Sequence, residues 1–189
     1  MRLIVAVTGM PGAGKSTAAK ALESRGWTRI VMGDVIREET RKRGLGEDEG
    51  GTGSVMRELR SEFGESAVAE LCVRKILESG SERVVVDGIR SMAEVETFQR
   101  VGKVKLVAVH ASRQRRFAFL RERGRSDDPL TYEMFLKRDK RELDVGIGNA
   151  IALADEVISN EHATPEQLSR ELISVVEEWA ESEGKKPQS

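Results

Sequence analysis

A glycine-rich turn close to the N-terminus constrains this chain more than any other stretch. Residues 9–17 read Gly-Met-Pro-Gly-Ala-Gly-Lys-Ser-Thr and lie between an apolar run, 3–7, and a run of strong helix formers, 18–22. The spacing G-x-x-x-x-G-K-S between a strand and a helix is that of the phosphate-binding loop, whose backbone N–H groups converge on phosphate oxygens. Lys15 is expected to reach the β- and γ-phosphates of a nucleoside triphosphate, and the Ser16 hydroxyl to ligate Mg²⁺. The residues expected to hold the nucleotide are Gly9, Pro11, Gly12, Ala13, Gly14, Lys15, Ser16 and Thr17.

Composition limits the other classes of function. A net charge of −1 argues against a protein whose main partner is nucleic acid. The single cysteine, Cys72, excludes an internal disulfide framework and favours a reducing cytoplasm. No apolar run approaches the length of a membrane span, and we expect no signal peptide. We predict one domain over residues 1–181 and a disordered polar tail over 182–189, in a monomer or homodimer with a nucleotide substrate.

Five short apolar runs alternate with helical segments along the chain. The runs at 3–7, 28–32, 83–86, 104–110 and 156–159 predict a five-stranded parallel sheet flanked by helices, the α/β class. Ligands of such sheets bind beyond the carboxyl ends of the strands. We expect a helix over 34–43 capped by Asp34, a loop over 44–53, a helix from Thr52 to about Phe63 and another from Glu65 to Ser79. Residues 34–80 are therefore the expected substrate-binding helical insertion.

Two further features point toward phosphoryl transfer. Asp87 follows a run of three valines, so we expect it beside the phosphate loop, supporting Mg²⁺ directly or through a water; the alternative is an aspartate that caps the following turn. Residues 113–141 are dense in arginine and are interpreted as a lid whose cations stabilise the transferring phosphoryl group. The candidates for that contact are Arg121, Arg125 and Arg138; the alternative is a solvated helical face.

Several segments resemble known small-molecule kinases. Gly33-Asp34-Val35-Ile36-Arg37 is similar to the Gly-Asp-x-x-Arg segment of adenylate kinases, and Asp87-Gly88-Ile89-Arg90 resembles their Asp-Gly-Phe-Pro-Arg segment but is one residue shorter. Residues 154–160 are similar to the last strand of dephospho-CoA kinases. From residue 3 to about 180 the chain most resembles an uncharacterised, mainly archaeal family related to both, supported by residues 124–129 and 138–143. The resemblance implies a P-loop kinase in which Arg37 and Arg90 hold the phosphate of a nucleoside monophosphate.

The chemistry of the acceptor leaves alternatives. A nucleoside monophosphate offers an anionic oxygen that needs no general base, and Arg37 and Arg90 can clamp it, with Asp34 orienting Arg37 and Arg60 as a possible third contact. Dephospho-CoA offers a ribose hydroxyl, for which Asp34 could accept the proton. In a third reading the protein is an adenylate-kinase-like ATPase that serves as an assembly or regulatory factor. We favour the monophosphate acceptor, with ATP and Mg²⁺ as donor and cofactor.

Overall fold

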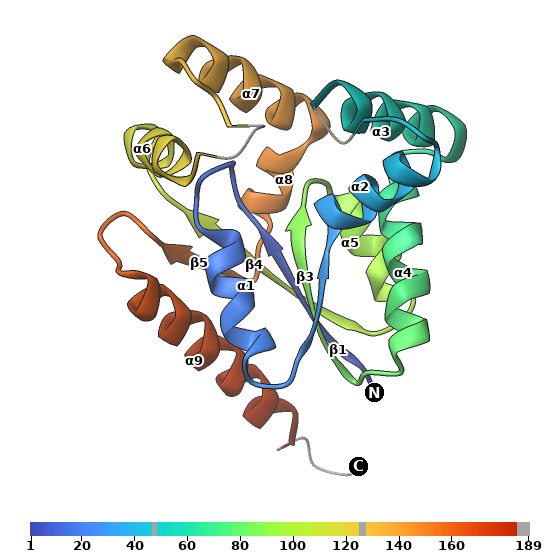
Figure 1. The fold of residues 1–189 in the computed structure, drawn as a ribbon. Coiled ribbons are helices and arrows are strands. Elements are labelled where there is room, and N and C mark those ends of the chain that lie inside the picture. Colours follow the sequence, from blue (N-terminus) through green and yellow to red (C-terminus); the bar gives the residue numbers. More distant parts are fainter. Residues whose placement is uncertain (47–48, 125–127, 185–189) are drawn as a thin grey trace.

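The computed structural model describes residues 1–46, 49–124 and 128–184, which form one sheet between two layers of helices (Figure 1). Within these residues five strands, all parallel, lie in the order β2-β3-β1-β4-β5. The predicted α/β class is confirmed. The strands are β1 (Leu3–Thr8), β2 (Thr28–Val31), β3 (Arg83–Ile89), β4 (Lys103–His110) and β5 (Glu156–Ser159).

Helices cover both faces because every central strand is apolar on both sides. On one face α1 and α9 bury Val5, Val7 and Val107 of the sheet. On the other face the core contains Ile4, Ala6 and residues of α2 to α5 and α8. Among the described residues no helix is long and apolar enough to cross a membrane. The helices are α1 (Lys15–Glu23), α2 (Met32–Lys42), α3 (Glu49–Phe63), α4 (Ala67–Ser79), α5 (Met92–Gln99), α6 (Arg113–Arg123), α7 (Tyr132–Val145), α8 (Ile147–Ala152) and α9 (Pro165–Gly184).

The strand order places the glycine-rich loop at the centre of the carboxyl edge. β1 lies between β3 and β4, and the chain passes from β3 to β4 on the other side of β1. Such a reversal of strand order opens a crevice at the carboxyl ends of the strands. The loop after β1, the end of β3 and the start of α2 therefore meet at one place.

The boundaries of α2 and α3 differ from those expected from the sequence. The prediction that Asp34 caps its helix is wrong, because β2 passes directly into α2 at Met32 and Val31 is the N-cap residue. Asp34 lies instead in the first turn, where its charge complements the helix dipole. The loop predicted to reach residue 53 ends earlier, since α3 begins at Glu49 and Thr52 lies inside it. Burial of Val55 and Leu59 on α3 outweighs the low helix propensity of the glycines.

Other boundaries moved by a few residues. Ser66, not Glu65, precedes α4, and β3 continues past Asp87 to Ile89 because its pairing with β1 resumes after a bulge. Helix α9 extends to Gly184, so the first three residues of the predicted tail, 182–184, are helical, and 185–189 lie outside the described residues. Ser112 and Thr131 cap α6 and α7 through their side chains.

Candidate active site

The glycine-rich loop leads from β1 directly into the N-terminus of α1. Lys15 is the first residue of the helix and Gly14 is its N-cap, with a φ of 104° that side chains rarely adopt. A Cβ atom at Gly14 would lie 2.4 Å from Nδ2 of Asn160. Asn160 donates from this atom to the carbonyl of Ala13 at 2.9 Å and thereby ties the loop to the end of β5. The first amides of α1 face a site for an anion, as at other helix N-termini.

The Lys15 ammonium lies folded over its own loop. Its Nζ donates to the carbonyl oxygens of Gly9 at 2.6 Å and Met10 at 3.2 Å. Burial lowers the pKa of Lys15 to about 8, although the charges of Asp87 and Glu142 act in the opposite direction. Phosphate oxygens at this position would stabilise the charged ammonium, so the arrangement favours an incoming polyanion.

Asp87 and Ser16 line the same cavity and supply two oxygen ligands that fit Mg²⁺. Strand β3 has a bulge at Gly88, whose φ is 109°. Val7 of β1 pairs with Asp87, but the next residue, Thr8, pairs with Ile89, so Gly88 has no partner in β1. Bulges next to functional sites re-aim side chains. The described residues contain no group of three or more His, Cys, Asp or Glu side chains able to hold a metal ion. A hydroxyl and one carboxylate match a Mg²⁺ ion that takes its other ligands from nucleotide phosphates and water.

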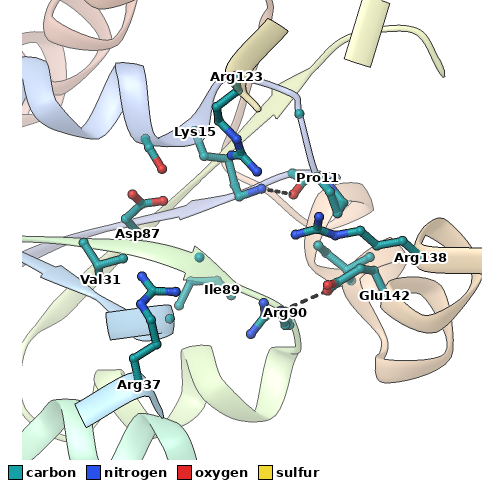
Figure 2. Close-up of a pocket in the computed structure, with 16 residues that line it drawn as sticks. Pro11, Lys15, Val31, Arg37, Asp87, Ile89, Arg90, Arg123, Arg138 and Glu142 are labelled. Atoms are coloured by element: carbon teal, nitrogen blue, oxygen red, sulfur yellow. Dashed lines mark hydrogen bonds and ion pairs between the residues drawn. The ribbon is translucent and has the colours of Figure 1, made fainter. Parts of the chain in front are cut away.

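A cavity of about 140 Å³ opens between the glycine-rich loop, the start of α2, the end of β3 and helix α7. Figure 2 shows side chains from these separate elements pointing toward one another across it. Five of its lining residues are basic and two are acidic, so its charge favours phosphate. The basic residues are Lys15, Arg37, Arg90, Arg123 and Arg138, and the acidic residues are Asp87 and Glu142.

The two arginines expected on the acceptor side both reach this cavity, and each has an acidic partner. Arg37 pairs with Asp34 one helical turn away, where both side chains are partly exposed. The Nε atom of Arg90 donates to Glu142 at 2.9 Å. Burial opposes ionisation of Glu142, but the charges of Arg90, Lys15 and Arg138 outweigh it and lower the pKa of this carboxyl. An ionised carboxylate therefore lies within a cationic cavity.

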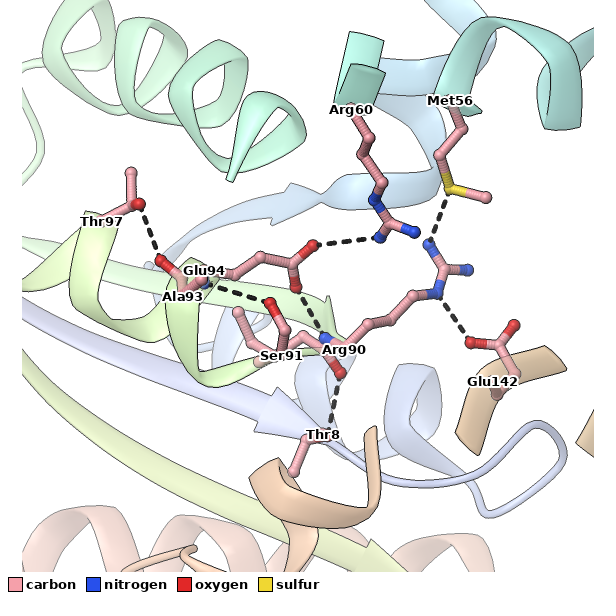
Figure 3. Close-up of polar contacts among 10 residues, drawn as sticks. Thr8, Met56, Arg60, Arg90, Ser91, Ala93, Glu94, Thr97 and Glu142 are labelled. Atoms are coloured by element: carbon pink, nitrogen blue, oxygen red, sulfur yellow. Dashed lines mark hydrogen bonds and ion pairs between the residues drawn. The ribbon is translucent and has the colours of Figure 1, made fainter. Parts of the chain in front are cut away.

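A buried carboxylate fixes the backbone that carries Arg90 (Figure 3). Glu94 is 1% exposed and accepts a hydrogen bond of 2.7 Å from the backbone N–H of Arg90. Its other oxygen lies 3.7 Å from Nη2 of Arg60 on α3. The Thr8 hydroxyl donates to the carbonyl of Ile89 at 2.9 Å. The network joins β1, β3, α5 and α3 around Arg90. Although the segment 87–90 is one residue shorter than the similar segment of adenylate kinases, Arg90 still lines the cavity. Arg60 contacts the network but does not line the cavity.

The arginines of the expected lid separate into different environments. Arg138 lines the cavity, as does Arg123, which the sequence reasoning did not single out. Arg121 is exposed, lies 5.9 Å from the ring centre of Phe117 and lines neither cavity described here. Arg125 lies outside the described residues. Arg116, within the same segment, is 4% exposed and forms a buried ion pair with Asp139 on α7.

A second cavity, of about 660 Å³, lies on the other side of the loop, between α6 and the turn from β5 to α9. Its walls include Phe119, His162 and Leu168, and the guanidinium of Arg115 lies 4.3 Å from the ring centre of Phe119. This volume is within the range of roughly 300–1,000 Å³ that is common for small-molecule sites. The two cavities meet over the loop, where both are lined by Gly12, Lys15, Ser16 and Arg123.

Comparison with known proteins places these features in a wider group. A sequence model described as an AAA domain matches residues 8–133. A UPF0200 protein of Thermococcus kodakarensis is 45% identical over 181 residues, covering 93% of this chain and 97% of that protein. A UPF0200 protein of Hyperthermus butylicus is 47% identical over 160 residues, covering 85% of this chain and 86% of that protein.

Solved structures share the fold at low sequence identity. TT1252 from Thermus thermophilus superposes with a TM-score of 0.65 at 20% identity, covering 94% of this chain and 97% of that one. A shikimate kinase from Bacteroides thetaiotaomicron gives a TM-score of 0.59 at 19% identity, covering 93% and 98%. At this identity the likeness shows a P-loop kinase-like fold and does not identify a substrate.

Proposed function

This chain belongs to the UPF0200 family, and we propose that it is a kinase that transfers the γ-phosphate of ATP to a nucleoside monophosphate. The observation that carries the proposal is the cavity in which Arg37 and Arg90 face the glycine-rich loop from the opposite side. The loop accounts for the donor phosphates, and these two arginines supply cations where a second phosphate would approach.

The larger cavity supports the donor assignment. It adjoins Lys15 and the N-terminus of α1, so a triphosphate on the loop would extend its nucleoside into this space. The planar guanidinium of Arg115 and the ring of Phe119 offer surfaces on which a base can stack. Bound Mg²⁺, held by Ser16 and Asp87, would neutralise charge on the transferring phosphate.

The smaller cavity supports an anionic acceptor. A phosphate oxygen of a nucleoside monophosphate is already ionised, so this transfer requires cations and alignment but no base. Lys15, Arg123 and Arg138 would contribute charge from the donor side, and Arg37 and Arg90 from the acceptor side. At about 140 Å³ the cavity is smaller than a typical small-molecule site of roughly 300 Å³ or more. The acceptor would therefore enter when α2 and α3 move away from α7. The return of these helices after binding would exclude water from the site.

Glu142 favours one second candidate. Its ionised carboxylate lines the acceptor cavity and could accept the proton of a hydroxyl, as dephospho-CoA or another hydroxyl acceptor requires. Asp34, the base expected for such an acceptor, is paired with Arg37 and does not line the cavity. In the monophosphate reaction Glu142 would instead position Arg90 until the acceptor phosphate binds.

A panel of acceptors tests the proposal. AMP, CMP, UMP, GMP, their deoxy forms and dephospho-CoA would each be incubated with Mg·ATP, followed by chromatographic separation of the nucleotides. We expect ADP together with a nucleoside diphosphate from at least one monophosphate. Phosphorylation of dephospho-CoA alone would favour the hydroxyl reaction, and equal ADP release with every acceptor or none would favour an ATPase.

Variants then locate the acceptor. Arg37→Ala removes a charge-assisted contact, so the KM for the acceptor should rise roughly ten- to a hundredfold while the KM for ATP changes little. Arg41→Ala, an exposed arginine on the same helix, is the matched control and should leave both constants unchanged. Equal increases for ATP and acceptor in the Arg37 variant would contradict the assignment. Glu142→Gln should abolish transfer to a hydroxyl, whereas transfer to a phosphate should persist.

A further inference from the structure

A buried arginine lies directly behind the carboxylate that would support the metal. Arg29 is on β2, two residues before Val31, which pairs with Asp87 across the β2–β3 ladder. Side chains two residues apart share a face of the sheet, so Arg29 and Asp87 point to the same side. Nη2 of Arg29 donates to Oδ2 of Asp87 at 2.7 Å, and the two side chains are 11% and 3% exposed.

The contact is costly for a purely structural ion pair. Nε of Arg29 is buried and has no hydrogen-bond partner among the described residues. Within the described part of the chain, the second ion pair of this guanidinium joins Nη1 to Glu23 at 3.5 Å, and the Glu23 side chain is half exposed. A buried guanidinium with an unpaired donor loses hydration that one carboxylate only partly offsets. An apolar side chain in this position would avoid that cost, so the arginine calls for a functional reason.

The ion pair with Arg29 determines which oxygen of Asp87 is available to a metal. Arg29 engages Oδ2 and so hinders rotation of the carboxylate, which leaves Oδ1 as the more available oxygen for a ligand in the cavity that Asp87 shares with Ser16. We propose that Arg29 is a positioning residue that restricts Asp87 to one metal-facing oxygen and so favours Mg²⁺ over Ca²⁺. The proposal rests on use of Mg·ATP in the proposed function but not on the identity of the acceptor.

The physical basis is the different coordination of the two cations. Mg²⁺ requires near-octahedral geometry, keeps several waters and takes carboxylates through single oxygens. Ca²⁺ accepts six to eight oxygens and readily binds a carboxylate through both. A carboxylate free to rotate would present both oxygens and reduce the difference between the ions. The fixed charge of Arg29 also repels any cation, which keeps the affinity moderate and allows the metal to exchange with the nucleotide.

Competition for bound Mn²⁺ tests this without any catalytic step. The full-length protein would be loaded with Mn²⁺ and a non-hydrolysable ATP analogue, and free Mn²⁺ would be measured by electron paramagnetic resonance as Mg²⁺ or Ca²⁺ is added. We expect the ratio of Ca²⁺ to Mg²⁺ dissociation constants to fall about tenfold in Arg29→Gln, the scale of one charge-assisted contact. Arg29→Lys keeps the charge but lacks the planar fork, so its ratio should fall less, roughly two- to threefold.

Glu23→Gln provides the matched control, because Glu23 contacts the same guanidinium without touching Asp87. Its ratio should equal that of the unaltered protein. A wild-type ratio in whichever Arg29 variants fold would overturn the proposal and leave the pair structural. An equal fall in the Glu23 variant would overturn it too. Absence of nucleotide-dependent metal binding in the unaltered protein would defeat both this proposal and the proposed function.

Discussion

The buried ion pair between Arg116 and Asp139 offers a sharp test of how the arginine-rich segment is held. Nη1 and Nη2 of Arg116 donate to the two carboxylate oxygens of Asp139 at 2.8 and 2.6 Å. The residues are 4% and 5% exposed. Nη1 also donates to the carbonyl of Pro11 at 3.1 Å, so one side chain on α6 joins α7 to the glycine-rich loop. Asp139→Asn removes the negative charge with little change in shape.

The expected cost follows from leaving the guanidinium buried with its charge uncompensated. Breaking a buried pair at one partner costs about 3–5 kcal/mol of the free energy of unfolding. For a chain of this length, each kcal/mol lowers the melting temperature by about 2–4 °C, so we expect a fall of roughly 6–20 °C. Urea unfolding followed by circular dichroism would measure the free energy directly. Because Pro11 is reached by the same guanidinium, the affinity for ATP should fall as well.

An exposed pair on the same helix is the control. Glu133 and Lys137 lie 2.9 Å apart with side chains 77% and 72% exposed. Glu133→Gln should change the free energy of unfolding by less than about 1 kcal/mol. The double variant Arg116→Met, Asp139→Leu should recover much of the loss, since no uncompensated charge remains. The reasoning would be refuted if Asp139→Asn proved no more destabilising than Glu133→Gln.

Three further predictions concern the loop and the core. With its pKa lowered to about 8, Lys15 is half charged at pH 8 in the free protein, so the binding of ATP at this pH should take up about half a proton. At pH 6 Lys15 is already charged before ATP binds, so it should contribute almost no proton uptake. Calorimetry in buffers of different ionisation enthalpy would show this, and Lys15→Arg, charged throughout, should lack it. Gly14→Ala forces a side chain into a φ of 104° and against Asn160, so we expect a loss of about 2 kcal/mol or more in urea unfolding and little ATP binding. Burial raises the pKa of Cys72 to about 12, so a thiol reagent at pH 8 should modify it only after unfolding; rapid modification of the folded protein would contradict that burial.

The sheet was predictable because its strands are runs of apolar residues bounded by polar ones. Burial on both faces of the sheet requires apolar side chains along each strand. Such a run can be recognised in the sequence without knowing which segments pack against it. The start of α3 was not predictable in the same way. Three glycines at 50–53 favour a loop locally, but Val55 and Leu59 pack into the core, and this tertiary burial stabilises the helix. Local propensity and tertiary packing conflict there, and packing prevails.

The candidate site was predictable where a motif fixes spacing and less so where only charge is informative. Lys15 and Ser16 follow from the glycine pattern, and Arg37 and Arg90 from segments that resemble kinases. Glu142 carried no signal, because a glutamate among the charged residues of a helix reads as solvated. Arg123 was hidden for the same reason, and only the packing of α6 places it at the cavity. Arg29 lies on a strand, and nothing in its local sequence indicated that it would contact Asp87.

The four arginines that line the smaller cavity each have a carboxylate partner. Arg37 pairs with Asp34, and Arg90 pairs with Glu142. Asp128 contacts both of the arginines that reach the cavity from α6 and α7. An incoming phosphate would therefore exchange one anionic partner for another and would not fill an empty cationic site. Because such an exchange conserves most of the pairing energy, the net affinity depends on which anion fits the planar guanidinium forks best. Discrimination among acceptors would then come from geometry. Replacing Glu142 by glutamine should therefore tighten the binding of a phosphate acceptor. The same change should reduce the difference in affinity between acceptors of different shape.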